Sequence, residues 1–171
     1  MLNWRTIVSK DVLPVVAGDG YWESNLREIV SEDASPPGLH LAVFLEPYLS
    51  YVLEGKKTVE SRFATRRYAP YRQIAPGDII LLKQSGGPIR GLCTVSDVWF
   101  YSLTPTSWRK LRKEFAEALC AQDPDFWKER QNASFATLMR LRSVRTIDPV
   151  AFPKQDRRGW VVLRSSGSLF S

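Results

Sequence analysis

The strongest constraint on the fold is residues 45–63, which read LEPYLSYVLEGKKTVESRF. Pro47 suits the first turn of a helix, where its missing N–H costs nothing. Gly55 stands where a helix ends in the left-handed conformation that glycine adopts most easily. Four apolar residues recur at helical spacing and are expected to face a core: Leu45, Leu49, Val52 and Leu53. The stretch therefore predicts a short helix that stops at a glycine.

Beyond Gly55 the apolar pattern changes to alternation, which predicts a strand. Val59 and Phe63 would face one side of this strand, and Glu60 and Arg62 the other. The turn would then bring four charged side chains together: Lys56, Lys57, Glu60 and Arg62. The alternative is that they are solvated charges at a helix end, because exposed lysine and glutamate are common on any protein surface.

The pattern Gly55-x-Lys57-x-x-Glu60-x-Arg62 resembles the signature of the ASCH family, which belongs to the PUA-like superfamily of RNA-associated domains. The resemblance extends more weakly over residues 39–164. It includes the turn at residues 76–78, a strand with Gly91-x-Cys93, and a late strand at residues 159–162. It implies a small twisted β-barrel with helices against it, and a cleft that the motif residues line.

The order of the expected elements independently favours an α+β fold with a mostly antiparallel sheet, because strands outnumber helices and do not alternate regularly with them. The chain of 171 residues suffices for one domain with a small addition. We expect an N-terminal helical extension over residues 1–38, an ASCH or PUA-like domain over 39–164, and a disordered tail over 165–171. The extension carries three basic and six acidic residues. It is either a packing cap or an acidic arm that lies over a basic face and competes with a ligand.

Several classes of protein do not fit the composition. No apolar run approaches the roughly 20 residues of a membrane helix, and the N-terminus lacks the features of a signal peptide. Cys93 and Cys120 are too few for a disulfide framework. With His40 as its one histidine, the chain has no recognised zinc spacing, and it has no glycine-rich phosphate loop. We therefore expect a cytoplasmic protein without a membrane partner, a metal or a cofactor.

The positive charge is concentrated around the motif. The formal net charge is +6, and residues 56–90 carry all of it: eight basic side chains are opposed there only by Glu60 and Asp78. A localised basic region is typical of a protein that binds a polyanion, although it can also serve solubility alone. The eight basic residues are Lys56, Lys57, Arg62, Arg66, Arg67, Arg72, Lys83 and Arg90.

Residues 64–75, ATRRYAPYRQIA, interleave arginines with tyrosines. Arginines bind phosphates, and tyrosine rings stack on unpaired bases, so this interleaving favours a site for single-stranded RNA over an ordinary polar loop. No protein partner can be named. The expected partner is RNA or another single-stranded nucleic acid. The predicted nucleic-acid-binding residues are Lys56, Lys57, Glu60, Arg62, Arg66, Arg67, Tyr68, Tyr71, Lys83 and Arg90.

Three functions are compatible with these residues. In the first, a basic cleft holds single-stranded RNA or a flipped and possibly modified base. Lys57 and Arg62 contact phosphates there, and Glu60 either accepts a hydrogen bond from the base or holds its two cationic neighbours in place. In another, the chain is a protein-interaction domain in transcription or translation, which would use the exposed face of the helix expected over residues 108–121.

The remaining function is hydrolysis, with Lys57 and Glu60 as catalytic residues. The resemblance implies two reactions, because some ASCH proteins are thought to cut RNA and a bacterial branch hydrolyses the acetyl amide of acetylated cytidine. In that branch a threonine stands at the position of Glu60, and a glutamate comes from a later strand. Here the later strand offers only Asp97. For Lys57 to act as a base, its pKa must fall. Cations at Lys56 and Arg62 lower it, and Glu60 raises it.

Overall fold

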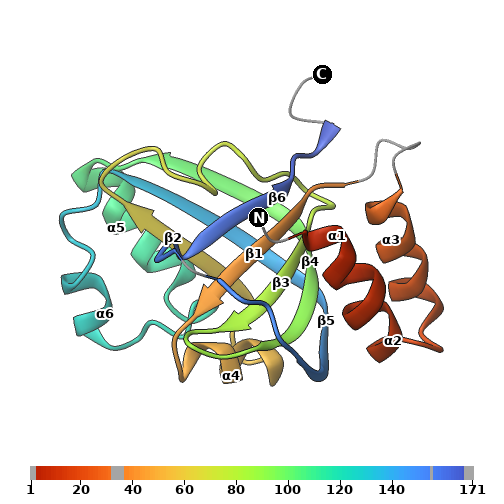
Figure 1. Cartoon of the computed structure of the whole chain (residues 1–171). Coiled ribbons are helices and arrows are strands. Elements are labelled where there is room, and N and C mark those ends of the chain that lie inside the picture. The colour runs from red at the N-terminus through yellow and green to blue at the C-terminus, as the bar shows by residue number, and fades with distance from the viewer. Residues whose placement is uncertain (1–2, 32–36, 155, 168–171) are drawn as a thin grey trace.

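The structure is a computed structural model that describes residues 3–31, 37–154 and 156–167 (Figure 1). These residues form a six-stranded sheet with the order β2-β5-β4-β3-β1-β6. Neighbouring strands pair antiparallel, except that β1 and β3 are parallel. The strands are β1 (Leu39–Phe44), β2 (Val59–Ala64), β3 (Ile79–Gln84), β4 (Ile89–Ser102), β5 (Phe135–Val150) and β6 (Trp160–Arg164).

Helices flank the sheet on two sides (Figure 1). Three short helices and a π-helical turn precede it: α1 (Trp4–Ile7), η1 (Val8–Val12), α2 (Leu13–Val15) and α3 (Gly20–Val30). The others lie between strands: α4 (Tyr48–Leu53), α5 (Pro105–Phe115) and α6 (Pro124–Lys128). None of the helices in the described ranges is long and apolar enough to cross a membrane.

The helix predicted from the first motif is confirmed as α4, and it is shorter than expected. It begins at Tyr48, with Pro47 as its N-cap, and Gly55 beyond its end has a φ of 78°. Leu49 and Val52 are buried as predicted. The expectation for Leu45 is wrong: its side chain is 69% exposed, because it precedes the helix and therefore does not follow the helical spacing.

The sheet curls into a half-barrel, which confirms the prediction of a mostly antiparallel PUA-like sheet with flanking helices. The curl follows the two longest strands, β4 and β5, whose pairing is interrupted by three register shifts. Gly91 lies at one of these shifts. A Cβ atom there would stand 2.7 Å from Leu53 Cδ2 and 2.8 Å from the Arg145 carbonyl oxygen, so only glycine allows this close approach.

Both faces of the sheet are covered, which explains why β1 and β3 are apolar at almost every position. On one face Leu39, Leu41, Ile79 and Leu81 form a core with residues of α1, η1 and α3. The opposite face packs against α4, and a further cluster joins β2 and β5 to α5 and α6. The N-terminal helices therefore act as a packing cap on one sheet face.

Both predicted domain boundaries, at residue 38 and at residue 164, have residues outside the described ranges nearby. Residues 32–36, before the proposed boundary at residue 38, and residues 168–171 of the predicted tail lie outside the described residues. Ser166, which also belongs to the predicted tail, is buried.

A buried polar cluster ties β1 and β6 to the turn before β3. The Trp160 indole N–H donates to His40 Nδ1 at 3.0 Å, so the proton of this imidazole lies on Nε2, which donates to Asp78 Oδ2 at 2.8 Å. Asp78 also accepts the backbone N–H groups of Gly38 and Ala75. All of these donors and acceptors are satisfied inside the protein, so the one histidine has a structural role.

Candidate nucleic-acid interface

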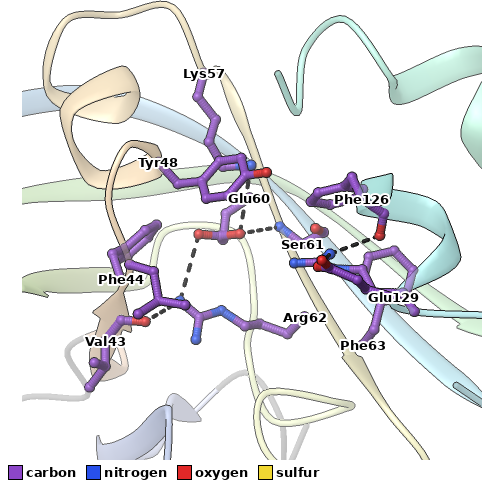
Figure 2. Close-up of a pocket in the computed structure, with 12 residues that line it drawn as sticks. Val43, Phe44, Tyr48, Lys57, Glu60, Ser61, Arg62, Phe63, Phe126 and Glu129 are labelled. Carbon is purple, nitrogen blue, oxygen red and sulfur yellow. Dashed lines mark hydrogen bonds and ion pairs between the residues drawn. The ribbon is translucent and has the colours of Figure 1, made fainter. Parts of the chain in front are cut away.

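A pocket of about 380 Å³ opens where the end of β1, the start of α4, strand β2 and the end of α6 meet (Figure 2). We call it the Lys57 pocket. Its polar lining consists of the motif residues Lys57, Glu60 and Arg62 together with Ser61, Glu129 and Arg130. Its apolar lining consists of Val43, Phe44, Leu45, Tyr48, Phe63 and Phe126.

Lys57 lies deep in this pocket, with 2% of its side chain exposed. Its ammonium donates to the Leu119 carbonyl oxygen at 3.0 Å and stands 3.8 Å from Glu60 Oε1. It also lies 5.4 Å from the centre of the Tyr48 ring. Burial lowers the pKa of Lys57, and the nearby Glu60 carboxylate opposes this shift. The lysine therefore loses its proton more readily than an exposed lysine does.

The backbone around Lys57 explains why it points inward. The N–H groups of Lys56 and Lys57 both donate to the Tyr51 carbonyl oxygen at the end of α4. The next two N–H groups, those of Thr58 and Val59, donate to the Ala118 carbonyl oxygen beyond α5. The turn is thereby fixed between the two helices.

Glu60 is the acidic centre of the cluster, and 5% of the residue is exposed. Its Oε1 accepts the backbone N–H of Ser61 at 2.6 Å. Its Oε2 stands 3.6 Å from Arg62 Nη2, so the carboxylate lies between the cations of Lys57 and Arg62. A carboxylate has about four acceptor positions, and it can therefore still accept hydrogen bonds from a ligand.

Arg62 bridges the open side of the half-barrel. Its Nη1 donates to the Gly159 carbonyl oxygen at 3.0 Å, and its Nη2 donates to the Val43 carbonyl oxygen at 2.9 Å. The guanidinium carbon lies 5.1 Å from the centre of the Phe44 ring and 5.2 Å from that of Trp160. One side chain from the edge strand β2 thus holds the end of β1 and the segment before the other edge strand, β6.

Sequence reasoning missed the contributions of α4 and α6. Tyr48 comes from the first position of α4, and Phe126, Glu129 and Arg130 come from α6 and the turn after it. Arg130 donates to the Phe126 carbonyl oxygen at 2.8 Å, and its guanidinium carbon lies 3.7 Å from the centre of that ring. Burial lowers the pKa of Arg130. No local pattern links these residues to the motif, because the fold brings them together from distant parts of the chain.

The structure separates three of the predicted residues from the pocket. Lys56 is exposed and pairs with Glu54 at 2.9 Å, although it neighbours Lys57 in sequence. Lys83 is buried, and its ammonium donates to the carbonyl oxygens of Gln84 and Gly87, so it closes the β3–β4 hairpin. Arg90 is exposed on β4 and does not line the Lys57 pocket.

The tyrosines of residues 64–75 line a second pocket of about 230 Å³, beside the first. Tyr68 is 61% exposed, whereas Tyr71 is buried against Phe100 and Phe135. The three arginines of this segment, Arg66, Arg67 and Arg72, are exposed. The Arg67 guanidinium carbon lies 5.3 Å from the centre of the Phe135 ring, which also lines this second pocket. Arg62 and Phe63 line both pockets.

The ASCH domain model matches residues 44–142, more than half of the chain, and this range includes the whole motif. The chain belongs to the ASCH family. The PUA-like fold of this family is generally linked to RNA binding. No protein in a search of curated proteins matches the sequence.

Solved structures support the same fold. The crystal structure of ASCH from Zymomonas mobilis is similar with a TM-score of 0.59 and 15% identity, and the match covers 77% of this chain and 90% of that one. Two single-residue mutants of the same Zymomonas mobilis protein have TM-scores of 0.59 and 0.58, both at 16% identity. These matches cover 74% of this chain and 88% and 90% of the mutants. At such identities the likeness concerns the fold alone.

Asp97, the one carboxylate that the later strand offers, does not line the Lys57 pocket. Asp97 pairs with Arg140 at 3.3 Å and accepts the Ser96 hydroxyl, on the exposed side of β4. The carboxylates in the Lys57 pocket are those of Glu60 and Glu129. Among the described residues, no group of three or more histidine, cysteine, aspartate or glutamate side chains could hold a metal ion.

Proposed function

We propose that this ASCH protein binds single-stranded RNA and that the Lys57 pocket receives one unstacked base. The observation that carries the proposal is the convergence of Lys57, Glu60 and Arg62 at one aromatic-walled pocket of about 380 Å³. Sites for small ligands are concave and combine apolar and aromatic walls with fixed polar groups, and this pocket contains both, although its lining is more polar than that of a usual small-ligand site.

The chemistry of the lining suits the edge of a base. Glu60 can accept a hydrogen bond from an exocyclic amino group, and Lys57 and Arg130 can donate to ring nitrogens or carbonyl oxygens. Tyr48 and Phe126 offer ring faces at the sides of the pocket. Proteins that accept an extruded base combine stacking between such side chains with hydrogen bonds to the base edge.

The charges outside the pocket suit the RNA backbone. Arg66 and Arg67 are exposed next to the second pocket, where they would contact phosphates. Binding of phosphates by cations releases counterions, so affinity for a single strand should fall with salt at a slope of about 0.7 per phosphate contact. The double variant Arg66→Ala/Arg67→Ala is expected to reduce this slope by about 1.4.

The salt dependence can be measured with a fluorescein-labelled single-stranded RNA by anisotropy at several salt concentrations. The matched control is Lys10→Ala/Arg27→Ala, which removes two exposed cations from the N-terminal helices. An equal slope for the Arg66→Ala/Arg67→Ala variant and the wild type would exclude these arginines from the RNA contact.

The pocket itself is tested by comparing neighbouring lysines. Lys57→Met removes the buried ammonium, and Lys56→Met removes an exposed one that pairs with Glu54. We expect Lys57→Met to weaken RNA binding at least tenfold, and Lys56→Met to leave it within twofold, with both variants checked for folding by circular dichroism. If both variants bind like the wild type, the pocket is not the RNA site.

Hydrolysis is the second candidate function, and one observation favours it: burial lowers the pKa of Lys57, which lines the pocket. A lysine that is neutral more often is a better general base or nucleophile. The protein would be incubated with acetylated cytidine and separately with RNA, and the products separated by chromatography. Turnover that disappears in Lys57→Met supports catalysis, and no turnover on either substrate removes this function for both reactions.

A further inference from the structure

The Lys57 pocket continues into a groove along the surface. The second pocket, about 230 Å³ in volume, shares Arg62 and Phe63 with the Lys57 pocket. A third pocket, about 580 Å³, shares Tyr68, Gly159 and Trp160 with the second one. Three adjoining hollows therefore lead from the buried lysine, past Arg62, to the segment before β6.

The second and third pockets together, which share Tyr68, Gly159 and Trp160, are called the Tyr68 groove. We propose that the Tyr68 groove is a second subsite, which holds the nucleotide adjacent to the one in the Lys57 pocket. The proposal rests on the RNA-binding function proposed above and makes it narrower. The ligand is a polynucleotide of at least two units and not a free nucleoside, because the two base sites are joined across Arg62.

Aromatic side chains give this groove its affinity for a base. Tyr68 is 61% exposed, so one ring is available for stacking before any ligand arrives. Trp160 and Phe135 also line the groove. Stacking on aromatic rings tolerates any base, so this subsite would bind the neighbouring nucleotide without reading its identity.

Arg62 stands between the two base sites, where the connecting phosphate would lie. A guanidinium has five N–H donors, and Arg62 uses two of them for the carbonyl oxygens of Gly159 and Val43. The remaining donors and 22% of the side chain surface stay available to a phosphate. The ion pair between Arg62 Nη2 and Glu60 Oε2 is long, at 3.6 Å, and neutralises the charge of Arg62 only in part.

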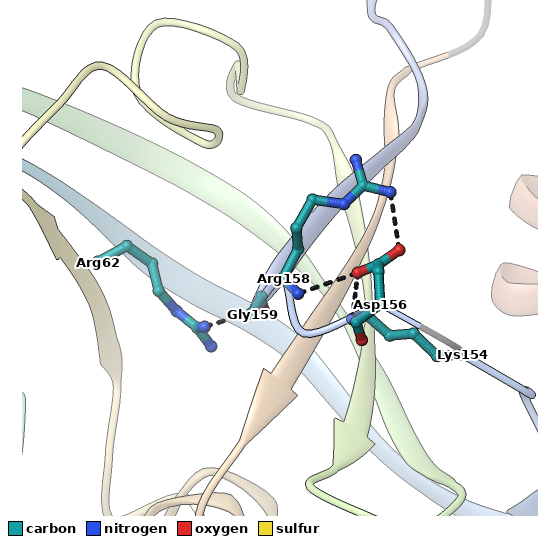
Figure 3. Close-up of polar contacts among 5 residues, drawn as sticks. All are labelled: Arg62, Lys154, Asp156, Arg158 and Gly159. Atoms are coloured by element: carbon teal, nitrogen blue, oxygen red, sulfur yellow. Dashed lines mark hydrogen bonds and ion pairs between the residues drawn. The ribbon is translucent and has the colours of Figure 1, made fainter.

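Arg158 supplies the charge at the far end of the groove. Figure 3 shows Arg62 and Arg158 on either side of Gly159. Arg158 donates to Asp156 Oδ2 at 3.0 Å, and Lys154 donates to Asp156 Oδ1 at 2.7 Å. One carboxylate thus faces two cations and holds Arg158 at the edge of the third pocket. The loop keeps a net positive charge that complements a phosphate.

The test compares a short RNA with single nucleotides. The probes are a fluorescein-labelled pool of random RNA hexamers and a mixture of the four ribonucleoside 5′-monophosphates, which compete with it in an anisotropy assay. Tyr68→Ala should weaken hexamer binding about tenfold and leave monophosphate binding unchanged. Arg158→Ala should lower the salt slope of hexamer binding by about 0.7. Tyr21→Ala and Arg27→Ala, exposed residues of α3, are the matched controls and should change neither quantity.

The outcomes separate this proposal from the one it rests on. If Lys57→Met loses binding while Tyr68→Ala and Arg158→Ala bind the hexamers like the wild type, the Tyr68 groove is not a subsite and the RNA function stands. If Tyr68→Ala weakens hexamers and monophosphates equally, Tyr68 acts on the first pocket and the subsite is likewise overturned. If Lys57→Met also binds like the wild type, both proposals fall. Displacement of the hexamers by an acidic peptide at similar concentration would show a site for charge alone and overturn the subsite.

Discussion

Replacement of Arg62 tests how the half-barrel is closed. Arg62→Ala removes two hydrogen bonds from a charged donor, to the carbonyl oxygens of Val43 and Gly159. It also removes the contacts of the guanidinium with the rings of Phe44 and Trp160. After this change no side chain of β2 holds the segment before β6 in the way that Arg62 does.

The cost of this change can be estimated from the contacts. Hydrogen bonds to charged groups contribute about 1.5–3 kcal/mol each. Because 22% of the Arg62 side chain is exposed, water can replace part of this contribution, and we take about half the sum of the two bonds, roughly 1.5–3 kcal/mol. Cation–ring contacts add about 0.5–1 kcal/mol. A total near 3 kcal/mol would lower the Tm of a chain of this size by about 6–12 °C.

The assay is thermal and urea unfolding followed by circular dichroism, with two further variants. Arg62→Lys keeps the charge but has one ammonium in place of the planar guanidinium. Its free energy of unfolding should therefore fall by about half as much as that of Arg62→Ala. Arg66→Ala removes an exposed arginine from the same region and should stay within about 0.5 kcal/mol of the wild type. If Arg62→Lys is as stable as the wild type, the two carbonyl contacts are not what closes the sheet.

Three further predictions concern stability. Because burial lowers the pKa of Lys57, the folded state binds fewer protons there than the unfolded state, and the free energy of unfolding of the wild type relative to Lys57→Met should rise from neutral pH toward 10.5. Urea unfolding across this range tests it, and a flat or falling difference would contradict it. Gly91→Ala should cost about 1–3 kcal/mol by overpacking, whereas Gly20→Ala, with open space around it, should be neutral; equal effects in thermal unfolding would refute the close approach. Trp160→Phe leaves the buried His40 Nδ1 without its donor and should cost about 1–3 kcal/mol in urea unfolding, and an unchanged stability would show that this hydrogen bond contributes nothing.

Features with a local physical cause could be predicted from the sequence. Thr104 caps α5, and Asp123 caps α6, each directly before a proline that suits the first turn. Alternation along β2 correctly placed Glu60 and Arg62 on the face opposite Val59. In each case the signal lies within a few residues of the structure it determines.

Other parts of the site depend on contacts between distant segments. Lys56 and Lys57 look equivalent in the sequence, but hydrogen bonds to Tyr51 and Ala118 fix the turn so that only Lys57 is buried. Arg130 reaches the pocket because α6 packs against Phe63, more than sixty residues earlier in the chain. Lys83 is among the predicted nucleic-acid-binding residues because of its charge alone. The carbonyl oxygens that bind its ammonium in the hairpin have no signature in the sequence.

The packing of the N-terminal helices has a consequence for how the protein can be divided. Leu39, Leu41, Ile79 and Leu81 are fully buried on the face that these helices cover, and their neighbours along the same strands belong to the core on the opposite face. A fragment beginning at residue 39 would keep every pocket residue and yet present a bare aliphatic surface, which is prone to self-association. Removal of residues 1–38 would therefore destabilise the cores on both faces of the sheet. The N-terminal helices and the half-barrel should accordingly unfold as one cooperative unit.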